Sequence, residues 1–456
     1  MIATSYATSA TAAYCAAPSF SASASELLQA CKGLEAFRKG AQSFRGWASS
    51  GLDADAAFFS TSGAGMTLEG FSWKEAFLAW LPSGDLSACG GFSLPWLPFF
   101  SFVKSAKGKG SISYESGRLC ASASGASLSL EAKPSLFDSE AAESQGLMRQ
   151  SYYLPEVAGK HLSEGAEGFP LLPFLTASAF ASADTGKLTL CGAGFSADAF
   201  FTTDGFSLRK APCRLPAFPK AGAFPSDAWL PAWLAPVLEA FAKPKEREDL
   251  LGFYFPARQG AQALRFCAPS GLIVALRFSE APGSFPACQS LIPDRLPFSF
   301  AIDRLAFLEA VESLQQALKS SAGSPLLDLS FDAEAGKLLL SALLQENKGT
   351  KARPDLVEVG RQEASCHASF RKASEDPRFA PGFYEKPEAE REGAMRTFES
   401  SRRLCINAGF LQRALKSFAA EGDRVLFQWK DERSPFLLSA FVPESLCLIM
   451  PVQKRR

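Results

Sequence analysis

The residue types that carry most enzyme chemistry are few and scattered in this chain. Among its 456 residues are two histidines and eleven cysteines, and no two cysteines form a C-x-x-C or C-x-x-x-C pair. His367 directly follows Cys366, but no second His or Cys stands at the spacing that a metal site or an activated nucleophile needs. The sequence therefore predicts no metal site and nearly excludes His-based acid–base catalysis.

Catalytic sequence motifs are missing as well. The chain has no G-x-S-x-G, no G-x-x-x-x-G-K-[ST], no G-x-G-x-x-G after an expected strand and no H-E-x-x-H. Asp and Glu are abundant, so a site built from carboxylates alone stays open. We expect a protein that is not an enzyme and that needs no cofactor.

Residues suited to a different chemistry, apolar binding, gather near residue 450. Residues 446–452 read LCLIMPV and are apolar throughout. Chain ends usually fray, whereas an exposed apolar group is typical of a binding surface. We expect a last strand that is held in a sheet, with an apolar lip at its end.

The residues before this lip predict the elements that position it. In residues 410–418 the apolar positions recur at helical spacing, while Arg413 and Lys416 fall on the opposite face. Gly422 follows as a stop signal, and residues 425–429 alternate as a half-buried strand. The segment thus predicts a helix followed by strands.

A similar order recurs along the chain. A strand and helix are predicted within residues 20–37, a second helix over residues 96–104, and a third helix followed by a hairpin within residues 298–343. We predict an α+β fold of three similar domains, each of two helix-plus-strands units. The expected bounds are 1–135, 150–295 and 297–456, and residues 139–168 lack a clear period.

Composition sets further limits. Lys plus Arg and Asp plus Glu both number 47, so the net charge is zero and no global basic field indicates a nucleic-acid binder. A locally basic face remains compatible with that balance. The cysteines in apolar runs favour reduced thiols and a cytoplasmic protein, and we expect neither a secretory signal nor a membrane helix.

Two more segments, together with the apolar lip, resemble a known family. Residues 203–208 read TDGFSL after an expected strand, and residues 285–293 read FPACQSLIP. These motifs, in this order and with helices and strands between them, resemble the bacterial DNA sliding clamps, the β subunits of DNA polymerase III. The resemblance covers nearly the whole chain and is weakest in residues 1–19, 134–168 and 345–400.

The resemblance implies a hydrophobic pocket that binds short apolar motifs of the DNA polymerase catalytic subunit and of the clamp loader. Its candidate residues are Leu175, Thr203, Gly205, Leu208, Pro286, Leu291, Leu448, Met450, Pro451 and Val452. Aliphatic walls and an adaptable Met suit Leu and Phe anchors. Leu175, Leu208 and Leu291 could equally be ordinary core residues.

Departures from the family pattern change the character of that pocket. Phe206 and Ser207 stand where the family has His-Arg, and Gln453 replaces the usual Arg. Ser290 stands where many members carry a basic or polar residue. The pocket is therefore expected to be more apolar and less charged.

The resemblance also implies a homodimeric ring, with helices inside and sheets outside, around double-stranded DNA without sequence specificity. Phosphate contacts of that kind need Lys and Arg on the inner helices. The candidates are Lys32, Arg38, Lys39, Lys104, Lys107, Lys109, Arg304, Lys319, Arg413 and Lys416. Each could also be solvated surface without a partner.

Residues 345–400 form a charged insert in the last third. Their Pro and Glu content predicts a long loop or partial disorder, with a short strand near residues 363–370.

The alternative function is a clamp-fold adaptor or structural protein that binds partner peptides without encircling DNA. A closed dimer with a basic bore favours the clamp, and a monomer with no basic interior favours the adaptor.

Overall fold

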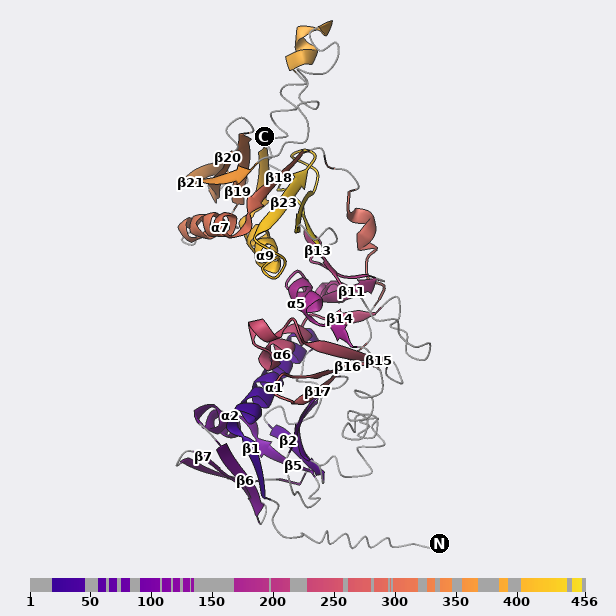
Figure 1. Ribbon diagram of the computed structural model, residues 1–456, viewed down its shortest axis with the longest axis vertical. Helices are drawn as coiled ribbons and strands as arrows, with labels where there is room; N and C mark the ends of the chain where they lie inside the picture. The colour runs from indigo at the N-terminus through magenta and orange to yellow at the C-terminus, as the bar shows by residue number, and fades with distance from the viewer. Residues whose placement is uncertain are drawn as a thin grey trace. The chain divides into compact units, whose positions relative to one another are not determined.

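The computed structural model describes most of the chain between residues 19 and 452. The described residues are 19–45, 56–62, 65–71, 75–82, 91–106, 109–115, 118–123, 126–131, 133–134, 168–196, 198–213, 228–256, 261–279, 283–293, 296, 298–318, 326–332, 337–346, 355–367, 385–392, 403–440 and 445–452. Helices and antiparallel sheets alternate along them (Figure 1), which confirms the predicted α+β class.

Six successive parts of the chain share one order of elements, which is a strand, a helix and three further strands. The first third contains β1 (Ser19–Ser23), α1 (Ala24–Arg45), β2 (Ala56–Ser62), β3 (Gly65–Phe71), β4 (Ala76–Pro82), β5 (Gly91–Pro95), α2 (Trp96–Ser105), β6 (Lys109–Glu115), β7 (Arg118–Ala123), β8 (Ala126–Glu131) and the short β9 (Lys133–Pro134). The middle third contains β10 (Phe169–Pro170), α5 (Leu172–Ser178), β11 (Gly192–Ser196), β12 (Ala199–Thr203), β13 (Ser207–Pro212), β14 (Trp229–Pro231), α6 (Leu234–Phe241), β15 (Leu251–Pro256), β16 (Ala261–Cys267), β17 (Ile273–Ser279) and the 3-10 helices η3 (Thr185–Leu190), η4 (Pro244–Glu246) and η5 (Cys288–Leu291). The last third contains β18 (Phe298–Asp303), α7 (Arg304–Leu318), β19 (Leu326–Asp332), β20 (Lys337–Glu346), β21 (Asp355–His367), β22 (Arg403–Asn407), α9 (Ala408–Ser417), β23 (Arg424–Trp429), β24 (Phe436–Ala440) and β25 (Leu446–Ile449).

The six parts exchange their first strands in pairs. β1 pairs with β6 and β5 with β2 in the first third, and the same exchange joins β10 to β15, β14 to β11, β18 to β23 and β22 to β19. Two further antiparallel pairs, β17 with β4 and β13 with β25, continue the sheets from one third to the next. Among the described residues, the result is sheets of four, nine and twelve strands.

The described chain divides into two compact units. One unit comprises residues 1–172, 215–224 and 233–280, and the other comprises residues 173–214, 225–232 and 281–456. The division runs through the middle third, because the β17–β4 pair ties part of that third to the first and the β13–β25 pair ties the rest to the last. The three predicted domain ranges remain a proposal.

The first unit is built around α1 and α6. Leu27, Cys31 and Leu34 of α1 are buried at helical spacing, and α1 packs against α6, β3 and β4. Gly33 permits this approach, since a Cβ there would lie 2.2 Å from the ring of Phe241 on α6. Any larger residue at this helix crossing would force the Phe241 ring to move.

The second unit has an aromatic core beneath α7 and α9. Phe427 of β23 stacks on Phe300 of β18 at 4.9 Å and on Phe436 of β24 at 4.8 Å, and Trp429 is fully buried beside them. α7 and α9 lie side by side on this core (Figure 1). The register follows from the predicted alternation over residues 425–429, which turns these rings inward.

The structure corrects the prediction for the insert. Residues 355–367, expected to be mostly loop, form the long strand β21, which pairs with β20 along its length and with β18 at its end. A helical turn follows at residues 388–392, within a short described segment. The predicted strand near residues 363–370 is the end of β21, which closes at His367.

Candidate functional site

The predicted TDGFSL motif forms a tight turn between β12 and β13. One carboxylate oxygen of Asp204, Oδ1, accepts hydrogen bonds from the backbone N of Phe206 at 2.9 Å and from the backbone N and the hydroxyl of Ser207 at 2.7 and 3.0 Å. The hydroxyl of Thr203 donates to the carbonyl oxygen of Ser207 at 2.7 Å. Gly205 has φ +92°, so the turn requires glycine there.

The apolar lip lies beside this turn because β25 pairs with β13. Leu448 faces Leu208 across the pair, and the backbone N of Met450 donates to the carbonyl oxygen of Phe206 at 2.9 Å. A residue near the end of the described chain is thereby fixed against a turn more than two hundred positions earlier. The predicted last strand, tied into a sheet, is confirmed.

The FPACQSLIP motif packs onto the same sheet pair. Cys288, in η5, is 3% exposed and belongs to a buried cluster with Leu208 and Leu448, against which Phe285 and Ile292 also pack. Burial raises the pKa of the Cys288 thiol to about 11, so this group stays neutral and packs as a small apolar side chain. All three motifs therefore meet at one buried cluster, which we call the three-motif cluster.

Three large apolar side chains around that cluster are exposed. Phe206 is 60% exposed, Leu291 is 55% exposed and Met450 is 40% exposed. Each comes from a different one of the three motifs. Folding gains little from apolar side chains left in water, whereas binding sites need them.

The other predicted pocket residues divide by burial. Leu208, Leu448, Thr203 and Leu175 are 8% exposed or less, and Pro451 is also buried, whereas Pro286 and Gly205 are exposed. Leu175 lies on α5, whose Ala177 carbonyl oxygen accepts a hydrogen bond from Thr202 of β12 at 2.6 Å.

Val452 lies in a different apolar cluster from the other pocket candidates. Its side chain packs against Leu326, Leu343 and Cys405, and its backbone N donates to the carbonyl oxygen of Cys405 at 2.7 Å. The end of the described chain is thus anchored to β22, beyond the three-motif cluster.

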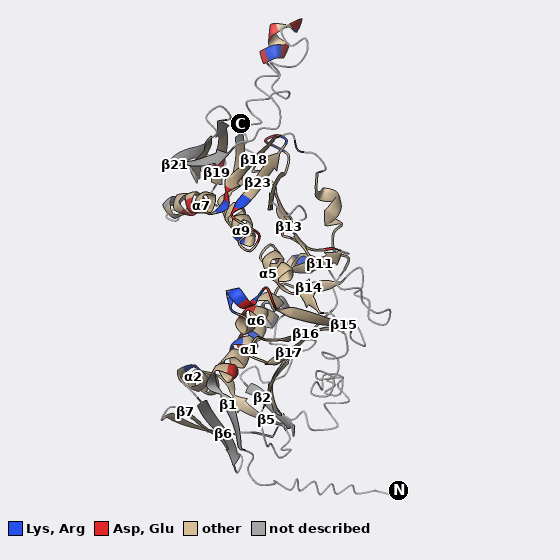
Figure 2. Cartoon of the chain, in the orientation of Figure 1, with Lys and Arg blue, Asp and Glu red and all other residues tan. Residues whose placement is uncertain are grey.

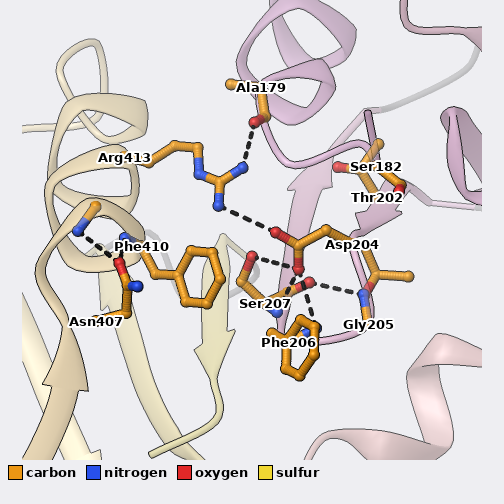
Figure 3. A network of polar contacts seen from close by, with 12 residues as sticks. Ala179, Ser182, Thr202, Asp204, Gly205, Phe206, Ser207, Asn407, Phe410 and Arg413 are labelled. Atoms are coloured by element: carbon orange, nitrogen blue, oxygen red, sulfur yellow. Dashed lines mark hydrogen bonds and ion pairs between the residues drawn. The ribbon is translucent and has the colours of Figure 1, made fainter. Parts of the chain in front are cut away.

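Sequence reasoning missed the role of α9 in this site. Arg413 of α9 pairs with Asp204 at 3.0 Å and donates to the carbonyl oxygen of Ala179 at 3.0 Å (Figure 3). Phe410, one turn earlier on α9, stacks on Phe206 with 6.3 Å between ring centroids and 16° between ring planes. No local sequence pattern could have joined Asp204 to Arg413, because 209 positions separate them.

Two of the candidates for phosphate contact are buried. Arg38 is 6% exposed, and its guanidinium group lies 5.1 Å from the centre of the Trp96 ring. Arg304 is also 6% exposed and donates through Nε to the carbonyl oxygen of Gly422 at 3.0 Å. Their positions are those of structural residues, and we leave both out of the proposed set of phosphate contacts.

The other described candidates lie in α1, α2 and α9, and Figure 2 colours the Lys and Arg positions of the described chain blue. Lys32 and Lys104 are exposed, and the ammonium group of Lys104 lies 4.2 Å from the centre of the Phe100 ring. Lys39 pairs with Glu35 at 3.2 Å and Lys416 with Glu312 at 2.9 Å. Lys107 and Lys319 lie outside the described residues, as does the side chain of Lys109.

The ion pair of Lys416 bears on the acidity of its partner, Glu312. Hydrogen bonds from Lys416 and then from Gln412 lower the pKa of Glu312. Both side chains are about half exposed, and water screens such a pair strongly. Lys416 therefore stays available to a stronger anionic partner.

Among the described residues, no three His, Cys, Asp or Glu side chains lie close enough together to hold a metal ion. The helices of the described segments are also too short or too polar to cross a membrane.

This arrangement of six strand–helix–strand parts matches the fold of solved bacterial sliding clamps. The β subunit of DNA polymerase III from Thermotoga maritima matches with a TM-score of 0.61 at 13% identity, over 96% of this chain and 100% of that one. The DNA polymerase sliding clamps of Caulobacter crescentus and Bacillus subtilis match with TM-scores of 0.60 and 0.59 at 15% and 13% identity, over 96% of this chain and 100% of each of theirs. The chain therefore has the fold of the bacterial DNA sliding clamps.

Comparison by sequence alone gives no such match. No protein-family model matches the chain, and no curated protein matches it. The identity to the solved clamps is 13–16%, so the similarity extends to the fold and not to the individual side chains of the site.

Proposed function

We propose that this protein is a DNA sliding clamp, which encircles duplex DNA without reading its sequence and tethers a DNA polymerase to it. The observation that carries the proposal is the clamp fold, which extends over 96% of the chain. A clamp of this kind is a processivity subunit and has no catalytic residues. Its contribution is the high effective concentration of the polymerase at the primer end.

The partner site of the proposed clamp is the three-motif cluster. Short motifs of the polymerase and of the clamp loader would place Leu or Phe anchors against Phe206, Leu291 and Met450. Such anchors would bury apolar surface that now faces water. The flexible thioether of Met450 can adapt to anchors of different shape.

The DNA contacts of the proposed clamp come from exposed side chains that a phosphate can reach. Within the part of the chain that the structure describes, no carboxylate lies at ion-pair distance from Lys32 or Lys104, and Lys39 and Lys416 can exchange a carboxylate for a phosphate. Contacts of this kind bind every sequence alike, which sliding requires.

A topological assay tests the proposal. The protein, loaded on primed circular DNA by its own clamp loader and ATP, is expected to stay bound during gel filtration at high salt and to leave when a restriction enzyme linearises the circle. Only an enclosing ring depends on the DNA having no ends. Equal loss from circular and linear DNA would contradict the clamp and leave a simple electrostatic contact.

The clamp-fold adaptor remains a second candidate because one observation favours it. The helices that would line a ring have only a small excess of positive charge. Together α1, α2, α5, α6, α7 and α9 carry eight Lys and Arg residues and five Asp and Glu residues. Two of those eight, Arg38 and Arg304, are buried. Peptide binding without retention on circular DNA would favour the adaptor.

A further inference from the structure

Asp204 uses both of its carboxylate oxygens within the second unit. Oδ1 holds the turn through the three hydrogen bonds from Phe206 and Ser207, and Oδ2 receives Nη2 of Arg413 at 3.0 Å (Figure 3). The side chain of Asp204 is 15% exposed and that of Arg413 is 27% exposed, so water screens the pair only in part. The turn and α9 are thus linked by a charge-assisted bond.

Arg413 is held on its other sides as well. Nη1 donates to the carbonyl oxygen of Ala179, just after α5, and the guanidinium group lies 5.2 Å from the Phe180 ring and 5.0 Å from the Phe410 ring. This one side chain therefore joins the end of α5, the β12–β13 turn and α9. Lysine could not reproduce that fork of contacts.

The Phe206 ring lies at the point where these contacts act. The backbone N of Phe206 donates a hydrogen bond to Asp204, and its carbonyl oxygen accepts one from the backbone N of Met450. The Phe206 ring stacks on Phe410, one turn before Arg413 on α9. Phe206 is 60% exposed, so packing within the described chain covers it only in part. Its orientation therefore depends on the turn and on α9.

We infer that Arg413 is a positioning residue of the partner site: it clamps Asp204 so that the turn presents the Phe206 ring, stacked on Phe410, to an aromatic anchor of a partner peptide. The inference rests on the proposed function, since it assumes that partner peptides bind at the three-motif cluster. Aromatic rings pair best with a ring already fixed in orientation. The inference assigns Arg413, a candidate phosphate contact in the sequence, to the binding of partner peptides.

The test compares Arg413→Gln with Arg433→Gln, which removes a guanidinium group from an exposed position of the same unit. The probe is a fluorescent synthetic peptide with Leu and Phe anchors, and the readouts are its Kd and the thermal midpoint of each protein. We expect Arg413→Gln to weaken the Kd about tenfold, as loss of a partly buried charge-assisted bond would, and Arg433→Gln to change it less than about twofold. Arg413→Lys should restore only part of the affinity.

A double-mutant cycle separates positioning from general support of the fold. If Arg413 acts through the ring, Arg413→Gln should add little to the loss that Phe206→Ala already causes. Additive losses, or an Arg413→Gln protein that binds as the wild type does, would overturn the inference while the proposed function stands. A wild-type protein that does not bind the peptide would overturn both. Asp204→Asn provides the same test from the other partner, should Arg413→Gln fail to fold.

Discussion

Arg209 is a fully buried cation at the pairing of β13 with β25. Its guanidinium group pairs with Glu421, after α9, and lies 4.4 Å from the centre of the Phe418 ring. Cys447 faces Arg209 across the strand pair, and burial, the largest influence on it, raises the pKa of its thiol. An ion pair at this depth is costly to break from one side, because the remaining charge has little access to water.

We expect Arg209→Ala to lower the free energy of unfolding by about 3 kcal/mol, since it leaves a cavity and an uncompensated Glu421. The double variant Arg209→Met with Glu421→Gln should recover most of that loss, because it keeps the volume and removes both charges. Urea unfolding followed by circular dichroism measures both. A double variant as unstable as Arg209→Ala would show that the charges themselves are needed.

At the scale of single residues, the family resemblance named Leu208, Leu448 and Met450 through short motifs that can be recognised locally, and the structure brings those motifs together. It did not name the polar contact that α9 makes with them. The partner of Arg413 could not be predicted, because the pairing of Arg413 with Asp204 depends on the packing of α9 against a turn from another third of the chain. Helical spacing placed Arg413 on the polar face of α9, where it would ordinarily meet solvent.

Among the elements, the β23–β24 connection is fixed by one carboxylate. Oδ1 of Asp431 accepts from the backbone N of Arg433 at 2.9 Å and of Ser434 at 2.7 Å. Partial burial by itself would raise the pKa of Asp431, but these hydrogen bonds, another from the Ser434 hydroxyl and the charge of Lys430 outweigh it and lower the pKa. The turn is therefore favoured by the ionised form.

This lowered pKa gives a pH-dependent stability. Because the pKa of Asp431 in the folded protein lies below its unfolded value of about 3.9, its contribution is complete above that pH and is lost as the pH falls through the folded pKa. We expect Asp431→Asn to cost about 1 kcal/mol at pH 7 and clearly less near pH 2. Urea midpoints of both proteins at the two pH values measure the difference. An equal cost at both would assign the effect to the shape of the side chain.

Elements were predictable where one pattern was strong. The helix expected over residues 96–104 is α2, Trp96–Ser105, because its bulky apolar residues recur on one face. The strand β21 was not predicted because charged residues and prolines surround it, although Val357, Glu358 and Val359 alternate between apolar and polar as a strand does. Its pairing with β20, over residues 337–346, settles the segment as a strand.

Across the whole molecule, the way in which the six parts join their sheets suggests how a second copy of the chain would join. Each of the six parts ends in a strand, and at both junctions within the chain the last strand of one part pairs with the last strand of another, namely β17 with β4 and β13 with β25. Two last strands remain. β8 is an edge strand, and residues 355–365 of β21 have no second strand partner among the described residues.

These remaining edges suggest how two copies of the proposed clamp would form a ring. If β8 of one copy pairs with β21 of the other, two copies make two identical junctions. The last strand of every one of the six parts is then paired with the last strand of another part. β8 reads ASLSLE and has only Glu131 as a charge, so it lacks the lysines and prolines that usually keep an edge strand from pairing. The exposed Leu97 of α2 and Leu305 of α7 are further candidates for burial between copies.

Light scattering at micromolar concentration should therefore give the mass of a dimer for the wild-type protein and of a monomer for the variant with Ala126→Lys and Ser127→Lys. Both side chains are exposed on β8, so the charges should oppose pairing with a second copy and leave the chain folded. The control is Ala419→Lys with Ala420→Lys, which adds the same two charges at exposed positions after α9 and should stay dimeric. A β8 variant that remains a dimer would place the interface elsewhere, and a monomeric wild type would contradict closure by two copies.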